Sequence, residues 1–516
     1  MRKKISKRNL IQIIPVLLFL IVFPGLINKP ESMKIPFAKN DDSVNIWWSS
    51  ELIPGSIVWY KNPPSPDAIR YKLSVQKPVY LKSASNEKNC SFRIDTALTF
   101  QSVSGIGTSL EATSIHALLK NKSEQEVSSW IRVLLDSENG MGLNMFRITI
   151  GTSDFSDGRA CSKHPKGFYS YQDDPDKPFS IQPDVDLKIV HVLQMVIEEA
   201  ARLKQPVIFF ASIWSPPAWM KTSENLIGGT LKKGYEGKLA NYFRQFIEAY
   251  EEKGIPVYAL TVQNEPNFLP DSYPGMLLSP EQERDIAIAI HNEFVDTTGG
   301  KRRINTRIWI NDHNMDNWEN PKWILTDLKS KGLLDIIDGV AFHHYEPRTS
   351  PESTTKLHNL FPDKDMHLTE HSEWGVSGMY NIQNYFLNWS RSYIYWVPMT
   401  TIKTDECNQG PYNTMQELSP PLFIERGVQT SDIYVTPEYY LLSQFSKFVR
   451  PGAIRVECNK GSVKNLTSVV FRNKDNTMIQ ILVNQTSKEQ KFVTWFGNRC
   501  FESLIPPKSV GTCKWK

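Results

Sequence analysis

The segment Val257–Pro266, VYALTVQNEP, begins as a buried strand and ends in polar residues and a proline. Its first part, Val257–Val262, is apolar and β-branched, as in a short strand covered on both faces. Asn264 and Glu265 follow directly, and Pro266 stops the strand. In parallel sheets the carboxyl ends of the strands carry the binding and catalytic groups. The segment therefore predicts a parallel βα architecture with a functional group at this edge.

Similar runs recur along the chain and alternate with helical patterns. Apolar residues repeat at helical spacing over residues 189–200 and 239–250, and Ser279-Pro280 is typical of a helix start. The predicted strands cover residues 103–107, 143–150, 206–212, 257–262, 304–310, 336–342, 366–369 and 393–399. Repeated βα units of this kind predict an α/β fold, a (β/α)8 TIM barrel, over residues 101–448.

The flanks of this region have strand and turn patterns without helices. We expect residues 30–100 and 449–516 to supply the two parts of one appended β-sandwich. Residues 1–29 form a separate leader: a basic patch precedes an apolar run from Leu10 to Ile27. It predicts a signal peptide or an uncleaved signal anchor, and either would place the body in the lumen of the secretory pathway or outside the cell.

Two further patterns agree with that side of the membrane. Six cysteines without a CxxC spacing favour disulfides over a metal site, and Cys500 and Cys513 are positioned to close a C-terminal hairpin. Five Asn-x-Ser/Thr sequons predict N-glycosylation. The acceptors are Asn89, Asn121, Asn388, Asn465 and Asn484.

The charge distribution argues against a nucleic-acid partner. The net charge is +4, but Arg2, Lys3, Lys4, Lys7 and Arg8 account for it within the leader. The body has neither a clustered basic face nor a zinc-finger spacing.

A second carboxylate follows another predicted strand, at Glu370. Retaining glycosidases need two carboxyl groups about 5–5.5 Å apart, one as acid/base and one as nucleophile. Glu265 and Glu370, at the ends of strands four and seven, are candidates for that pair. Glu373 competes with Glu370, and an isolated surface glutamate is more often only solvated.

The chain resembles the glucosylceramidase family, glycoside hydrolase family 30, over nearly all of residues 95–516. The matching stretches are Gly105-Ile106-Gly107, Phe146-Arg147, Ser153-Asp154-Phe155-Ser156, residues 211–221 (ASIWSPPAWMK), Gln263-Asn264-Glu265-Pro266 and Phe445-Ser446-Lys447-Phe448. The resemblance implies Glu265 as acid/base and Glu370 as nucleophile. It also implies substrate-site roles for six residues: Arg147, Asp154, Trp214, Asn264, His343 and Tyr345.

The resemblance implies hydrolysis of the β-glucosyl bond of glucosylceramide by double displacement, without a cofactor, at a membrane surface in the lysosome or outside the cell. Anionic lipid and a saposin-type activator are the partners it suggests. Two alternatives stay open: a β-glycosidase for another sugar or a soluble glycan, and a non-catalytic glycan- or lipid-binding relative.

Departures from the family pattern bear on the sugar site. The family has tryptophan where His344 stands, and its sugar-stacking tryptophan after strand eight is expected at Met399. Thr108–Glu111 replaces a glycine-rich stretch and an aspartate.

A metal-dependent hydrolase is a further alternative. His343, His344, Asp312 and His371 carry ligand atoms suited to zinc. Adjacent residues of a strand point to opposite faces, so only one of the two neighbouring histidines can face the cleft. We therefore expect no metal.

Overall fold

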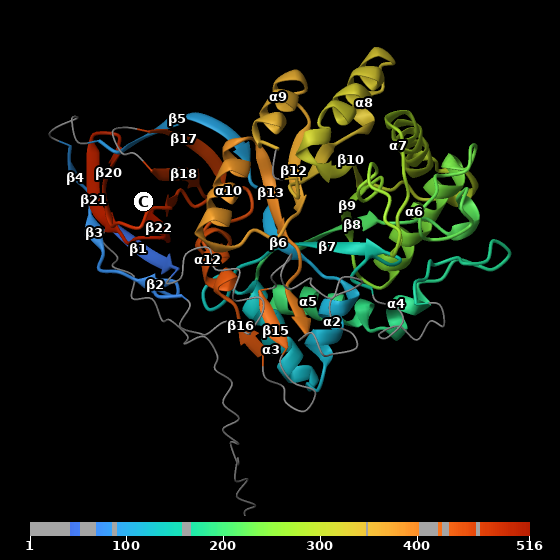
Figure 1. The fold of residues 1–516 in the computed structure, drawn as a ribbon, viewed down its shortest axis with the longest axis horizontal. Coiled ribbons are helices and arrows are strands. Elements are labelled where there is room, and N and C mark those ends of the chain that lie inside the picture. The colour runs from blue at the N-terminus through green and yellow to red at the C-terminus, as the bar shows by residue number, and fades with distance from the viewer. Residues whose placement is uncertain are drawn as a thin grey trace, which may run out of the picture. The chain divides into compact units, whose positions relative to one another are not determined.

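The computed structural model describes residues 42–51, 69–84, 90–156, 167–346, 349–401, 422–425, 433–460 and 465–516. Eight parallel strands close into a barrel in the order β6-β7-β8-β9-β10-β11-β12-β13 (Figure 1). They are β6 (Gly105–Ser109), β7 (Met145–Ile150), β8 (Ile208–Ile213), β9 (Val257–Thr261), β10 (Arg307–Asn314), β11 (Gly339–His343), β12 (Asp365–Glu370) and β13 (Ser390–Tyr395). The predicted TIM barrel is confirmed. The leader lies outside the described residues.

Helices follow most of these strands and cover the barrel. They are α2 (Ala112–Leu119), α3 (Glu124–Leu135), α4 (Gln182–Asp186), α5 (Ile189–Arg202), α6 (Glu236–Glu252), α7 (Pro280–Val295), α8 (Glu319–Ser330), α9 (Glu352–Leu360), α10 (Gly375–Leu387) and α12 (Pro437–Ser446). Helix α7 begins at Pro280, and the Ser279 hydroxyl caps it by accepting from the Gln282 N–H at 3.3 Å. None of the described helices is long and apolar enough to span a bilayer.

The packing of β6, the first barrel strand, explains why its motif Gly105-Ile106-Gly107 contains glycine. A Cβ at Gly107 would lie 1.4 Å from the carbonyl oxygen of Met145 on β7, so only glycine allows β6 and β7 to pair this closely. Inside the barrel, Met145, Phe210, Ala259 and Trp309 are fully buried in one apolar cluster. This packed interior fixes the strand ends at which the candidate residues lie.

Strand eight ends earlier than its sequence suggested. The predicted strand ran over residues 393–399, but β13 ends at Tyr395, and Met399 begins a separate short strand, β14 (Met399–Thr401). β14 pairs with β15 (Phe423–Glu425), which pairs with β16 (Ile433–Val435). The apolar run is continuous across both strands, so it does not reveal the break. The first residue after β13 is therefore Trp396.

The flanks form one sheet, which confirms the appended β-sandwich. Its strand order is β2-β1-β22-β19-β18-β17-β5-β20-β21-β4, with β3 beside β1. Buried side chains from strands of both flanks meet in one core, among them Trp48, Phe92, Leu482 and Trp515. The strands are β1 (Ser43–Ser50), β2 (Ser74–Val75), β3 (Val79–Tyr80), β4 (Lys82–Ser83), β5 (Phe92–Ser102), β17 (Ile454–Lys460), β18 (Leu466–Arg472), β19 (Met478–Asn484), β20 (Gln490–Phe496), β21 (Arg499–Ile505) and β22 (Ser509–Trp515).

The expected disulfide between Cys500 and Cys513 is not formed. Both residues are buried and carry free thiols, and Cys458, which is half-buried, is also a free thiol. The physical reason is topology: Cys500 lies on β21, which pairs with β20 and β4, whereas Cys513 lies on β22 between β1 and β19. Cys161 and Cys407 lie outside the described residues.

A buried carboxyl group on α12 predicts an acid-stable fold. Glu438 is fully buried and accepts the Gly375 N–H at 3.2 Å, while its other oxygen has no hydrogen-bond partner among the described residues. Burial, with the charge of Glu51 added to it, raises the pKa of Glu438 to about 8 although the hydrogen bond opposes the shift. The folded state thus retains a proton that the unfolded chain releases near the usual pKa.

Stability is therefore expected to be fully present below that usual value and to fall as the pH rises toward 8. Glu438→Gln should remove roughly 2–4 kcal/mol of the difference in unfolding free energy between pH 5 and pH 8. Thermal denaturation at both pH values measures this, with Glu252→Gln, at an exposed position of α6, as the control. An equal pH dependence in wild type and Glu438→Gln would contradict the assignment.

Candidate active site

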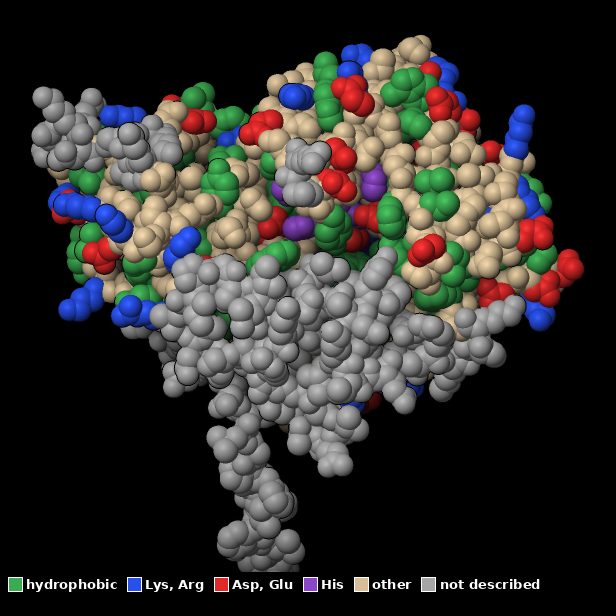
Figure 2. All heavy atoms as spheres, in the orientation of Figure 1, with side chains coloured by type: hydrophobic (Ala, Val, Ile, Leu, Met, Phe, Trp, Pro, Cys, Tyr) green, Lys and Arg blue, Asp and Glu red, His purple; other side chains and the backbone are tan. Residues whose placement is uncertain are grey.

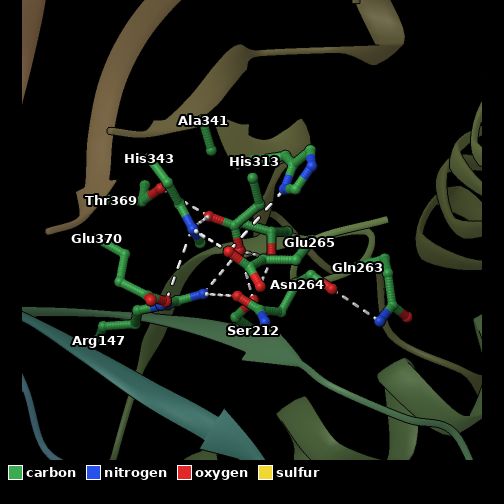
Figure 3. Close-up of polar contacts among 12 residues, drawn as sticks. Arg147, Ser212, Gln263, Asn264, Glu265, His313, Ala341, His343, Thr369 and Glu370 are labelled. Carbon is green, nitrogen blue, oxygen red and sulfur yellow. Dashed lines mark hydrogen bonds and ion pairs between the residues drawn. The ribbon is translucent and has the colours of Figure 1, made fainter. Parts of the chain in front are cut away.

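The two predicted carboxylates face each other at the carboxyl end of the barrel. Glu265 lies in the turn after β9, and Glu370 is the last residue of β12 (Figure 3). One oxygen of each carboxylate and one nitrogen of His343 all lie within 4.8 Å of one another. The spacing of two such carboxyl groups distinguishes retaining glycosidases, at about 5–5.5 Å, from inverting ones, at about 6.5–9.5 Å. This pair therefore has the retaining geometry.

Glu370 is held by two donors, one on β7 and one in the loop after β11. The Arg147 guanidinium, on β7, contacts Glu370 Oε2, and the Tyr345 hydroxyl donates to Glu370 Oε1 at 2.8 Å. Burial opposes the charge on Arg147, but the carboxylates of Asp312 and Glu370 raise its pKa further, so it stays cationic. These contacts orient the Glu370 carboxylate.

Glu265 is in contact with a charged histidine. His343 Nδ1 lies 3.2 Å from Glu265 Oε1, and His343 Nε2 lies 3.1 Å from Asp312 Oδ1. Burial opposes protonation of His343, but the charge of Glu370 and the hydrogen bonds to Asp312 and Glu265 raise its pKa to about 10. Burial raises the pKa of Glu265, but the hydrogen bond from His343 and the charges of His343, His313 and Arg147 together outweigh it, so the pKa lies below its usual value.

Asp312 joins the two halves of the site, a role that sequence reasoning missed. It is fully buried and accepts from Arg147 Nη2 at 2.9 Å and from the hydroxyls of Ser212 and Thr369, each at 2.6 Å. Burial opposes its ionisation, but Arg147 and His343 hold its pKa far below the usual range. Its position near the end of β10 was the available signal, but from sequence Asp312 was expected only as a possible metal ligand.

The remaining predicted substrate residues surround this pair. Asn264 Oδ1 accepts from Arg147 Nη2 at 2.7 Å, and the Trp214 ring lies under the Arg147 guanidinium, 4.7 Å from ring centroid to Cζ. Asp154 is half-buried after β7, and burial together with the charges of Glu370 and Glu111 raises its pKa well above the usual value. Arg147, Asp154, Trp214, Asn264, His343 and Tyr345 are thus brought to the same end of the barrel as the two glutamates.

The expected position of the strand-eight tryptophan was wrong. Trp396 follows β13 directly, stacks on Trp214 with ring centroids 5.8 Å apart, and lies 5.7 Å from the Arg147 guanidinium. Met399 is buried elsewhere, where its carbonyl oxygen accepts from the Ser114 hydroxyl at 2.6 Å. The aromatic side chain after strand eight is therefore present in this cleft.

Glu111 occupies the loop after β6, where the family has an aspartate. It is fully buried and accepts from the hydroxyls of Ser109, Thr149 and Ser153, each at 2.6 Å. Burial raises its pKa although these hydrogen bonds oppose the shift. Glu111 thus fixes the loops after β6 and β7 rather than opening into the cleft.

The histidine pair separates as strand alternation requires. His343 points into the barrel, whereas His344 points outward, with Nδ1 2.5 Å from the Tyr385 hydroxyl and 3.8 Å from Glu373. His371 lies on the same outer side, 3.3 Å from Glu373. The four-residue metal site considered from sequence is therefore not formed, and Glu373 does not share the position of Glu370.

A different group, Glu265, His343 and Glu370, brings three potential ligand atoms together. Arg147 already contacts Glu370, and charged His343 lies between the two carboxylates. A divalent ion there would meet two cations in a site with little water. The ligand atoms of Glu265, His343 and Glu370 therefore do not fit a resident metal ion.

The sequons differ in accessibility. Asn121 and Asn465 are exposed. Asn388 is half-buried, and its amide nitrogen donates to the Asn384 carbonyl at 2.9 Å. Asn484 is fully buried, and its amide nitrogen donates to the carbonyls of Lys488 and Pro506 at 2.9 and 2.7 Å. A glycan on Asn484 is incompatible with this fold, so that prediction is withdrawn. Asn89 lies outside the described residues.

Figure 2 shows acidic and histidine side chains gathered with hydrophobic ones near the middle of one face, around β12 and β13 of Figure 1.

Two family models cover most of the chain. The glycosyl hydrolase family 30 TIM-barrel domain matches residues 103–449, and the family 30 beta sandwich domain matches residues 452–513.

Curated relatives carry two kinds of name. The chain is 27% identical over 435 residues to putative glucosylceramidase 2 of Caenorhabditis elegans, covering 79% of each chain. It is 26% identical over 446 residues to the lysosomal acid glucosylceramidase of Mus musculus, covering 81% of this chain and 82% of that one. It is 25% identical over 460 residues to an endo-1,6-beta-D-glucanase of Neurospora crassa, covering 82% and 88%.

A solved endo-beta1,6-glucanase has the same fold, with a TM-score of 0.74 at 22% identity over 92% of this chain and 100% of that one. The names of these relatives agree only on the class of reaction, because they state different substrates. With its barrel and its sandwich both matched, this protein belongs to glycosyl hydrolase family 30 and is a glycosidase.

Proposed function

We propose that this chain is a retaining β-glycosidase that hydrolyses the β-glucosyl bond of glucosylceramide to glucose and ceramide. The observation that carries the mechanism is the pair Glu265 and Glu370, whose nearest oxygens lie within 4.8 Å, with Arg147 and Tyr345 both on Glu370. The similarity to two glucosylceramidases supports the lipid substrate.

The first step forms a glycosyl-enzyme. A Glu370 oxygen attacks the anomeric carbon as the bond to the glycosidic oxygen breaks, and Glu265 gives its proton to that oxygen. Arg147 and Tyr345 orient the attacking carboxylate. Since Asn264 Oδ1 is occupied by Arg147, its amide NH₂ group is the part that faces a sugar hydroxyl.

The second step releases glucose. Glu265, now a carboxylate, takes a proton from water as the water oxygen attacks the anomeric carbon and the bond to Glu370 breaks. The first step requires protonated Glu265, and His343 lowers the pKa of that group. Acid pH therefore favours turnover, which supports the lysosomal lumen, or an acidic exterior, as the place of action.

A second candidate is hydrolysis of β-1,6-linked glucan. Relatives with that name match at nearly the same identity, and the glucosylceramidase and glucanase reactions would use the same two carboxylates. We retain anionic lipid and a saposin-type activator as proposed partners for the lipid substrate only. A non-catalytic relative is disfavoured, because binding alone does not require the two carboxylates together with Arg147.

The test uses the full chain, purified after secretion from eukaryotic cells, at pH about 5. Glucose release is measured from glucosylceramide in phosphatidylserine vesicles, with and without a saposin, and from β-1,6-glucan. A cyclitol epoxide inactivator followed by mass spectrometry should label Glu370. Turnover of glucan without turnover of the lipid would reject glucosylceramidase activity, and the absence of both turnover and label would reject the enzyme assignment.

A further inference from the structure

His313 is a buried histidine beside the acid/base to which the mechanism gives no task. It lies near the end of β10, and its side chain is 7% exposed. Its Nδ1 has no hydrogen-bond partner among the described residues and lies 4.0 Å from Glu265 Oε1 (Figure 3). A buried polar atom without a partner costs free energy, so its presence beside the reacting groups calls for a ligand.

The two histidines next to Glu265 differ in what they can still bind. Both ring nitrogens of His343 are engaged, one by Glu265 and one by Asp312. Burial lowers the pKa of His313, and the nearby charge of His343 lowers it further against the opposing effect of Glu265. Burial therefore disfavours the charged form of His313, and its Nδ1 is available to a bound molecule.

The position of His313 points to the leaving group rather than to the sugar being transferred. Glu370 must approach the anomeric carbon, and its contacts are Arg147 and Tyr345. Glu265 must instead reach the glycosidic oxygen. His313 lies beside Glu265, and within the described part of the chain no ion pair joins it to Glu370. A polar group carried by the aglycone next to the glycosidic oxygen is within its reach.

Apolar side chains lie on the same loop as the acid/base. Phe268 and Leu269 are 43% and 44% exposed, and the Phe268 N–H donates to the Glu265 carbonyl at 2.9 Å. The preceding residue, Asn267, accepts from Asn320 Nδ2 at 2.9 Å, which fixes this loop to the first turn of α8. The acid/base loop thus carries two exposed apolar side chains three and four residues after Glu265, on a backbone that is hydrogen-bonded to Glu265 and to α8.

We propose that His313, Phe268 and Leu269 form the aglycone subsite, and that it takes a lipid aglycone with a hydrogen-bond donor beside its glycosidic oxygen. His313 accepts from that donor, and the two apolar side chains contact the hydrocarbon. A sphingoid base has this chemistry, since it carries an amide N–H and a hydroxyl close to the oxygen that bears the sugar. The proposal rests on the proposed glucosylceramidase function.

The first test compares His313→Phe, which keeps the ring but removes both nitrogens, with His313→Asn, which keeps a polar atom near the Nδ1 position. Each is assayed on a short-chain glucosylceramide and on nitrophenyl β-glucoside, whose leaving group has no donor. We expect His313→Phe to lower the ratio of kcat/KM on the lipid to that on the aryl glucoside by about tenfold or more. His313→Asn should restore most of the ratio.

The second test concerns the apolar part. The double variant Phe268→Ser/Leu269→Ser should raise KM for the short-chain lipid several-fold relative to the aryl glucoside. Leu504→Ser is the matched control, because Leu504 is a 48% exposed leucine on β21 of the sandwich. Equal effects of the double variant and the control would overturn the apolar part of the subsite.

Other outcomes reject the proposal in distinguishable ways. An equal loss on both substrates in His313→Phe, with a shifted pH profile, would show that His313 acts through Glu265 and not on the aglycone. If His313→Phe lowers the kcat/KM ratio only when a β-1,6-linked glucose disaccharide is assayed in place of the lipid, the hydrogen-bond donor belongs to a sugar. That result would overturn the lipid aglycone. Wild-type turnover of the aryl glucoside without any turnover of the lipid would instead reject the proposed function itself.

Discussion

Glu370→Gly is expected to lower kcat on an aryl β-glucoside by about 10⁴-fold or more, because no other carboxylate can form the glycosyl-enzyme. Arg147 and Tyr345 would remain, so the pocket keeps donors that can hold a small anion in place of the lost carboxylate. Sodium azide should therefore restore turnover and yield the α-glucosyl azide, since the anion attacks from the face that Glu370 used. Chromatography and NMR of the product measure both results.

Glu373→Gln is the matched control for that experiment. Glu373 is the neighbouring carboxylate, but it is hydrogen-bonded to Tyr385 and Asn381 on the outer side of β12. Burial opposes its ionisation, yet the charge of His371 and the surrounding hydrogen bonds lower its pKa to about 2. Formation of α-glucosyl azide by Glu373→Gln, with none from Glu370→Gly, would show that the nucleophile had been assigned to the wrong glutamate.

Glu265→Ala is expected to have an effect that depends on the leaving group. General acid catalysis contributes about 10²–10⁴-fold, and it matters most when the departing oxygen is a poor leaving group. Turnover of a lipid or alkyl glucoside should fall by that factor, whereas formation of the glycosyl-enzyme from a dinitrophenyl glucoside needs no proton and should fall far less. Steady-state and burst kinetics on the two substrates separate these steps.

Azide distinguishes this variant from the loss of the nucleophile. With Glu370 intact, the glycosyl-enzyme forms, and azide attacks it from the side that Glu265 vacated, so the product is the β-glucosyl azide. An α-azide from Glu265→Ala, or a loss that is the same for both leaving groups, would contradict the acid/base role. The control is Glu283→Ala, because Glu283 is also buried but accepts the Asn311 N–H behind the barrel strand.

Much of the architecture and the central pair could be predicted from sequence. Strand ends in a barrel are marked by a change from apolar to polar residues, and Asn264-Glu265-Pro266 and Glu370 both stand at such a change. Alternation along a strand also required that only one of His343 and His344 face the barrel interior, and the family resemblance gave that position to His343. These inferences depend only on local sequence, which is why they could be drawn without coordinates.

Other features depend on the register between strands, which local sequence does not encode. In β10 the pairing with β11 shifts between Asn311 and His313, and Asn311 and Asp312 have φ angles of 77° and 44°. This bulge turns two consecutive residues toward the site, so that Asp312 contacts Arg147 while His313 lies beside Glu265. Strict alternation would have allowed only one of them.

Two wrong expectations have the same origin. The strand ended at Tyr395 instead of continuing to Met399, because pairing with β6 stops there although the apolar sequence continues. Asn484 carries a sequon, but its side chain is used to hold a turn of the sandwich. A motif records which chemistry a residue permits, whereas burial in the folded chain decides whether that chemistry is accessible.

The sheet formed by both flanks has a consequence for how the molecule is made. Strand β22 lies between β1 and β19, so residues that are made long after β1 occupy an inner position of the sheet. Until β22 emerges from the ribosome, β1 has no partner on that side. A premature stop codon at position 509 would delete an interior strand, and the newly made chain would keep two open edges for chaperones or for aggregation.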